Sequence, residues 1–138
     1  FVYILGSSIM HKEFTEFCSH LERWTLAIGR DTKSRVRVEP KASGKSIVQV
    51  LKRIPGLNII EAATPIGSKV ERVHAITAEL EAGKVLIPWD DDAKYGGTWI
   101  QNFIAECEAF PRGKHDEQVD ELCGIMDNRN VVQKLAYR

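Results

Sequence analysis

The chain has 138 residues, of which 43% are hydrophobic and 28% are charged, and its 19 lysines and arginines balance its 19 aspartates and glutamates. A chain of this length can bury roughly two-thirds of its unfolded surface, which predicts one globular domain. No apolar run approaches the ~20 residues that a membrane span requires, so we exclude a membrane protein. Because the net charge is zero, any contact with nucleic acid must come from a local basic patch.

The cysteines and the first residues suggest the context of the chain. Cys18, Cys107 and Cys123 are widely spaced and form no CxxC pair, which favours a reducing compartment over a disulfide framework. The chain begins with the strand-like residues Phe1–Leu5, without an initiator Met or the basic segment of a signal peptide. We therefore expect it to be a piece cut from a longer protein.

The first half of the chain has the patterns of alternating strands and helices. Apolar runs rich in β-favouring residues, or alternation with period two, predict strands. Apolar residues that recur at three- and four-residue steps predict helices. We expect strands at residues 1–5, 35–39 and 57–61 and helices at residues 13–28 and 45–54.

The second half continues this alternation, and Ser68 is a candidate N-cap for its first helix. We expect helices at 67–80 and 98–110, a last helix that reaches Met126, a strand at 84–88, a loop at 89–97 and a polar, irregular tail at 127–138. The order of elements predicts an α/β fold in which helices flank a sheet, within one domain over residues 1–126.

Four ionisable side chains crowd the start of the last helix. They are His115, Asp116, Glu117 and Asp120, and they follow a turn that contains Pro111 and Gly113. Neighbouring carboxylates repel one another unless a cation, a proton or solvent compensates, although a helix N-terminus tolerates negative charge. The stretch is therefore either a solvated acidic first turn or part of a site.

The position of Glu39 favours the second alternative, that the acidic stretch is part of a site. This residue ends a predicted strand before a small-residue loop, where open α/β sheets place their ligands, while Asp116 and Asp120 are one helical turn apart on one face. Hard oxygen ligands suit Mg²⁺ or Mn²⁺, and two such ions roughly 3.5–4 Å apart support phosphodiester cleavage. Convergence of the three carboxylates would therefore predict nucleic-acid hydrolysis.

Basic residues near these acids are candidates for phosphate contacts. Lys69 and Arg72 lie three residues apart and share a helix face, where they are either solvated charges or DNA ligands. We also expect Lys41 and Lys114 to contact DNA.

Four stretches, at residues 38–44, 69–72, 81–88 and 110–120, together resemble the C-terminal nuclease domain of the large terminase subunit of tailed bacteriophages. They read VEPKASG, KVER, EAGKVLIP and FPRGKHDEQVD, and the resemblance covers most of the chain up to Met126. It implies an RNase H-like fold with a mixed sheet. It also implies an endonuclease that cuts concatemeric phage DNA around packaging with two Mg²⁺ or Mn²⁺ ions.

The resemblance also implies partners and a location. The partners are double-stranded DNA, an ATPase domain earlier in the same polypeptide, the small terminase subunit and the portal. The location is the cytoplasm of the bacterial host.

The resemblance assigns roles to the acids. Glu39 matches the second acidic ligand of the family. Asp116 and Asp120 match the first and last acids of its His-Asp-Asp-x-x-Asp pattern. Glu117 stands where an Asp is usual, and His115 ranks below the acids as a metal ligand or phosphate contact. Lys69 and Arg72 match the basic pair that the family carries on the helix facing DNA.

One ligand of the family is missing from the chain. Its first metal-binding Asp lies on the central strand, but no acid occurs between Phe1 and Met10. We therefore expect the strand that carries it to precede residue 1.

Two other interpretations remain open at this point. The chain is either another RNase H-like nuclease, such as a Holliday-junction resolvase or an integrase-like protein, or a non-catalytic DNA-docking or assembly module whose acids are solvated.

Overall fold

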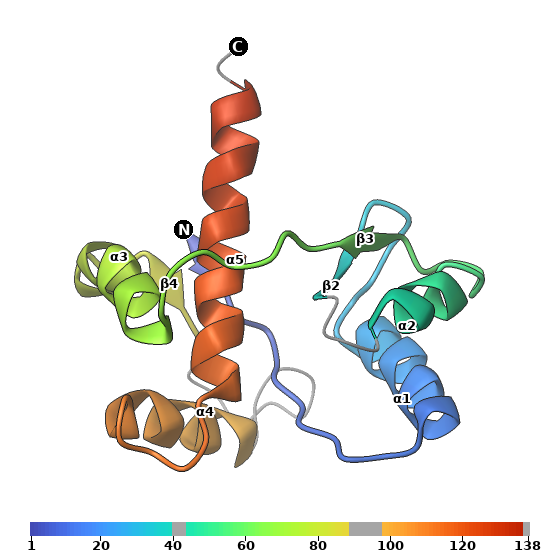
Figure 1. Ribbon diagram of the computed structural model, residues 1–138, viewed down its shortest axis with the longest axis horizontal. Coiled ribbons are helices and arrows are strands. Elements are labelled where there is room, and N and C mark those ends of the chain that lie inside the picture. Colours follow the sequence, from blue (N-terminus) through green and yellow to red (C-terminus); the bar gives the residue numbers. More distant parts are fainter. Residues whose placement is uncertain (40–43, 89–97, 137–138) are drawn as a thin grey trace. The chain divides into compact units, whose positions relative to one another are not determined.

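The structure is a computed structural model that describes residues 1–39, 44–88 and 98–136, without the side chains of 44–46 and 129–136 (Figure 1). The chain divides into two compact units. Unit 1 comprises Phe1–Ser8 and Ile66–Arg138, and unit 2 comprises Ile9–Pro65. Their positions relative to one another are not determined, so each unit is described by itself.

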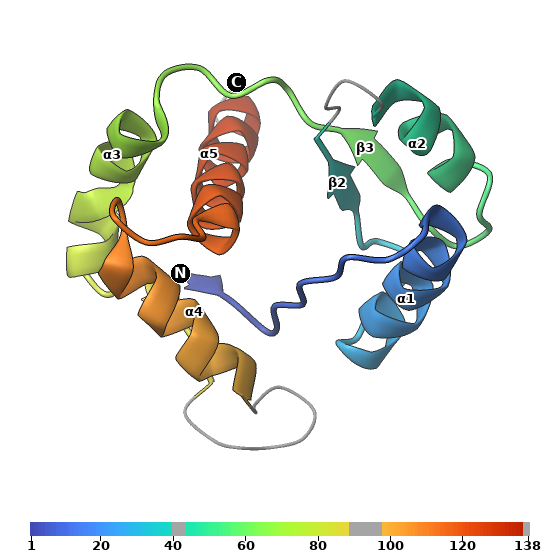
Figure 2. The ribbon, with the colours of Figure 1, turned by 60° about the horizontal axis from the view of Figure 1, so that its bottom comes forward.

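Unit 1 combines a short parallel strand pair with three helices. Its elements are β1 (Val2–Tyr3), α3 (Lys69–Glu81), β4 (Val85–Leu86), α4 (Thr98–Ala109) and α5 (Glu117–Ala136). Strands β1 and β4 are parallel, with Val2 opposite Val85. Helix α5 packs against both α3 and α4 (Figure 2). The buried core is made of Ile4, Ile76, Phe103, Leu122, Cys123 and Met126.

Unit 2 has a second parallel strand pair and two helices. Its elements are α1 (Phe14–Ala27), β2 (Val36–Val38), α2 (Gly44–Leu51) and β3 (Ile59–Glu61). Strands β2 and β3 run parallel, with Val36 opposite Ile59 and Val38 opposite Glu61. The buried core comprises Val48, Leu51, Leu57 and Ile59, against which Phe17, Cys18 and Leu21 of α1 pack.

Helix α3 shows how local sequence sets an element. The Ser68 side chain accepts from the N–H of Glu71, and the Glu71 carboxylate accepts from the N–H of Ser68. This reciprocal capping box confirms the predicted cap and satisfies two N–H groups that helical bonding leaves free. Gly83, at φ 68°, follows the helix in the left-handed conformation that commonly ends helices.

The predicted helices and strands are present among the described residues, with bounds that differ by up to three residues and with one larger difference. The predicted irregular tail is wrong for residues 127–136, because α5 continues to Ala136. No Gly or Pro occurs from Ile125 to Ala136, and the Leu, Ala, Lys and Gln residues there favour helix regardless of polarity.

The described strands form two separate two-stranded sheets. Both strand pairs among the described residues are parallel, so the mixed sheet and the single domain over residues 1–126 stay predictions. The loop at 89–97 lies outside the described residues. Within the part of the chain that the structure describes, no helix has both the length and the apolarity needed to cross a membrane.

Candidate functional site

The acidic stretch forms the turn between α4 and α5 and the first turn of α5. Gly113 packs closely in this turn, since a Cβ added there would lie 3.0 Å from the Cβ of Ala109. Asp116 immediately precedes α5, and its carbonyl accepts the N–H of Asp120 at 3.0 Å. Asp116 is therefore the N-cap residue, and Asp120 follows it one turn later.

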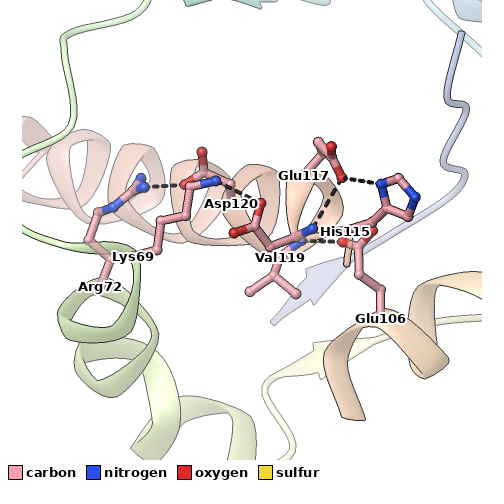
Figure 3. A network of polar contacts seen from close by, with 8 residues as sticks. Lys69, Arg72, Glu106, His115, Glu117, Val119 and Asp120 are labelled. Atoms are coloured by element: carbon pink, nitrogen blue, oxygen red, sulfur yellow. Dashed lines mark hydrogen bonds and ion pairs between the residues drawn. The ribbon is translucent and has the colours of Figure 1, made fainter. Parts of the chain in front are cut away.

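Lys69 of α3 pairs with Asp116. Its Nζ lies 2.7 Å from Asp116 Oδ1, and the two side chains are 45% and 38% exposed (Figure 3). The hydrogen bond to Asp116 raises the pKa of Lys69. The ammonium group is therefore fully charged near neutral pH and compensates one of the crowded acids.

Arg72, one turn further along α3, donates a hydrogen bond to Asp120 Oδ1 (Figure 3). This pair is far less accessible, because the side chains are only 11% and 15% exposed. The Nε of Arg72 is buried and has no partner among the described residues. We call Lys69, Arg72, Asp116 and Asp120 the charge ladder, since its two ion pairs join α3 to α5.

The buried side chain of Glu106, on α4, also forms hydrogen bonds to the first turn of α5. Its Oε2 accepts the N–H of Val119 at 2.9 Å (Figure 3). Its Oε1 accepts from Gln118 Nε2 at 3.3 Å. Gln118 in turn accepts from Ser7 Oγ at 2.6 Å. Glu106 is not among the site residues predicted from the sequence. The available signal was its position three residues after Phe103, on the apolar face of a predicted helix.

His115 and Glu117 contact each other. The His115 Nδ1 to Glu117 Oε2 distance is 3.6 Å, and both side chains are more than 60% exposed (63% and 61%). The hydrogen bond from its own backbone N–H is the main reason why the pKa of Glu117 is lowered. Their predicted role as metal ligands stays a prediction.

Glu39 belongs to unit 2, where it is half-buried and directly follows β2. The N–H of Ala62 donates to the carbonyl of Val38, so Glu39 and Glu61 lie at the same end of the strand pair. The position of Glu39 relative to Asp116 and Asp120 is not determined. Among the predicted DNA contacts, Lys114 is exposed, and Lys41 lies outside the described residues.

The residues fit a divalent cation in kind but not in number. Asp116 and Asp120 offer the hard oxygen donors that Mg²⁺ and Mn²⁺ prefer. Each of them, however, already accepts from a cationic side chain of α3. Across the described residues, no group of three or more His, Cys, Asp or Glu side chains is placed to hold a metal ion. Within the described residues of unit 1, Asp116 and Asp120 therefore lack a third ligand of this kind.

Comparison with known proteins identifies the family. A family model described as the terminase RNaseH-like domain matches residues 9–129, a range that includes Glu39 and the whole charge ladder. Searches of the curated proteins and of the solved structures gave no match. The family implies a nuclease in general terms, and RNase H-like nucleases commonly use divalent metals. The chain belongs to the terminase RNaseH-like domain family, which confirms the resemblance drawn from its motifs.

Proposed function

We propose that this chain is the nuclease part of a phage terminase large subunit, an endonuclease that cuts concatemeric viral DNA during genome packaging with Mg²⁺ or Mn²⁺. One observation carries the proposal within this family. Asp116 and Asp120, which match the acids of its motif, lie one turn apart at the start of α5 and project toward the basic residues of α3.

In this proposal Glu39, Asp116 and Asp120 hold the metal ions. Asp116 is the more accessible acid of the ladder, and Glu39 directly follows a parallel strand, where α/β folds commonly place ligands. A bound divalent ion would supply an activated water and stabilise the leaving oxygen of the phosphodiester. The chain's own part is to hold these carboxylates against mutual repulsion, which Lys69 and Arg72 do in unit 1.

The proposal includes partners. Lys69, Lys114, Lys41 and Arg72 would contact the phosphates of double-stranded DNA, and exposed Lys114 and Lys69 are the most available. An ATPase domain of the same polypeptide, the small terminase subunit and the portal would bring DNA to the site in the host cytoplasm.

Plasmid cleavage tests the function. We expect the full-length protein, with the Asp-bearing strand that should precede residue 1, to nick supercoiled plasmid in Mn²⁺. It should lose this activity on Glu39→Ala or Asp116→Ala. Matched controls are Glu61→Ala, at the same strand end as Glu39, and Glu108→Ala, an exposed acid of α4. Cleavage that survives both site substitutions would contradict the assignment.

A second candidate is a DNA-docking module without catalysis, which the pairing of both α5 acids with basic residues favours. Calorimetric titration with Mn²⁺ separates the two functions, because a module of this kind should show no saturable metal binding. Holliday junctions compared with linear duplex would identify a resolvase, which should prefer the junction.

A further inference from the structure

At the start of α5, a buried carboxylate from another helix accepts the backbone N–H that the N-cap side chain usually accepts. Such a side chain ordinarily accepts the N–H of the second or third helical residue. In α5 the third residue is Val119, which is 5% exposed, and its N–H donates to Glu106 Oε2 of α4. The Asp116 carboxylate instead accepts from Lys69, on α3.

Glu106 is itself held in place from both sides. It is only 8% exposed, and Gln118 donates to its second oxygen. Ser7 fixes the other end of the Gln118 amide at 2.6 Å. A carboxylate buried to this extent is costly unless its oxygens are hydrogen-bonded, and both oxygens of Glu106 are.

We propose that Glu106 is a positioning residue for Asp116. Because Glu106 caps α5 from α4, the Asp116 carboxylate is free to face α3, where it pairs with Lys69 and would bind a metal ion in the proposed function. The inference rests on the proposed function for its catalytic meaning, but its geometric part stands independently. Without Glu106, the buried N–H of Val119 has no acceptor, and the Asp116 side chain is the one that the N-cap position directs to it. Asp116 would then turn away from the site.

A double-mutant cycle measured by thermal unfolding tests the geometric part. In the otherwise unaltered chain, Asp116→Ala removes only an exposed ion pair, and we expect a small fall in Tm. In the Glu106→Ala background the same substitution removes the replacement cap, and we expect a fall about twice as large or more. Equal falls in the two backgrounds would overturn the proposal.

Metal dependence of cleavage tests the catalytic part. We expect Glu106→Ala to raise the Mn²⁺ concentration for half-maximal plasmid cleavage by about tenfold, as for other groups that orient a metal ligand. The KM for DNA should not change. Phe103→Leu, a core substitution one turn away on α4, is the control for lost stability and should leave the Mn²⁺ response unaltered.

Glu106→Gln separates capping from charge. Its amide oxygen can still accept from Val119, and rotation of the Gln118 amide can satisfy the new NH₂ group. We expect near-normal Mn²⁺ dependence in this variant, and a response like that of Glu106→Ala would overturn the capping mechanism. Should Glu106→Ala fail to fold, Gln118→Leu removes one anchor of Glu106 and should cause a smaller change of the same kind.

The outcomes distinguish this inference from the proposed function. Loss of cleavage in Asp116→Ala with an unaltered Mn²⁺ response in Glu106→Ala would overturn the positioning role alone. Cleavage that persists in Asp116→Ala would contradict the proposed site, and the unfolding cycle would still decide whether Glu106 holds Asp116 in place.

Discussion

The two ion pairs of the charge ladder have the same charges but different surroundings. Lys69 and Asp116 are 45% and 38% exposed, whereas Arg72 and Asp120, one turn further, are 11% and 15% exposed. An exposed pair contributes little to stability because water already solvates both charges. A buried pair has lost that solvation, so each charge depends on the other.

This difference divides the tasks of the two acids. Asp120 is tied to Arg72, and removing either partner would leave an uncompensated buried charge. The pair of Lys69 and Asp116 is exposed, so the proposed replacement of Lys69 by a metal ion would cost little stability. Unit 1 thus combines a pair that holds α3 to α5 with a pair that could be exchanged in the proposed function.

The largest expected effect comes from breaking the less exposed pair, Arg72 and Asp120, which we call the inner pair. Asp120→Ala leaves the Arg72 guanidinium nearly buried without its counter-charge, and we expect a loss of about 3 kcal/mol in the free energy of unfolding. Urea denaturation measures it. The double variant Asp120→Ala, Arg72→Met should regain much of the loss, because no buried charge then remains unpaired. A single variant as stable as the parent chain would show that the inner pair is solvated.

Breaking the more exposed pair, Lys69 and Asp116, which we call the outer pair, should lower the free energy of unfolding much less. Lys69→Met removes the partner of Asp116, and we expect less than about 1 kcal/mol of destabilisation, because both side chains are well exposed. The effect should shrink further in high salt, which screens exposed charges. Denaturation at two salt concentrations measures it, and a loss as large as that of Asp120→Ala would contradict the contrast between the pairs.

The smallest effect concerns Glu71, an acid of α3 that bonds within its own helix. The backbone N–H of Ser68 is the main cause that lowers the pKa of Glu71 from 4.5. A lowered pKa means that the stabilisation is present above about pH 4.5 and is lost as the pH falls through the pKa of the folded state. We expect Glu71→Gln to lower Tm slightly at pH 7, and the difference from the parent chain should fade in acid. A difference that persists at pH 2 would exclude this origin.

Much of the fold follows from local patterns. The three- and four-residue periodicity predicted the five helices that the described residues form, and Ser68 forms the cap that its position indicated. The continuation of α5 beyond Met126 does not follow from the apolar pattern, because most residues there are polar, although no Gly or Pro ends the helix.

The candidate site was predictable only in part. The spacing of Asp116 and Asp120 predicted that they share one face of the last helix. The spacing of Lys69 and Arg72 predicted that they share one face of an earlier helix. That these faces meet depends on how α3 and α5 pack, which local periodicity does not specify. Glu106 was missed for the same reason, because a buried acid becomes meaningful only when the helix N-terminus that it caps is known.

The first main-chain hydrogen bond of α5 links the two acids directly. The amide of Asp120 donates to the carbonyl of Asp116, so each carboxylate sits at one end of the same bonded turn. Opening of that turn would separate the acids and release the amide to solvent at once. Deuterium uptake at this one amide is therefore a direct measure of how often the free protein loses the spacing of its two carboxylates.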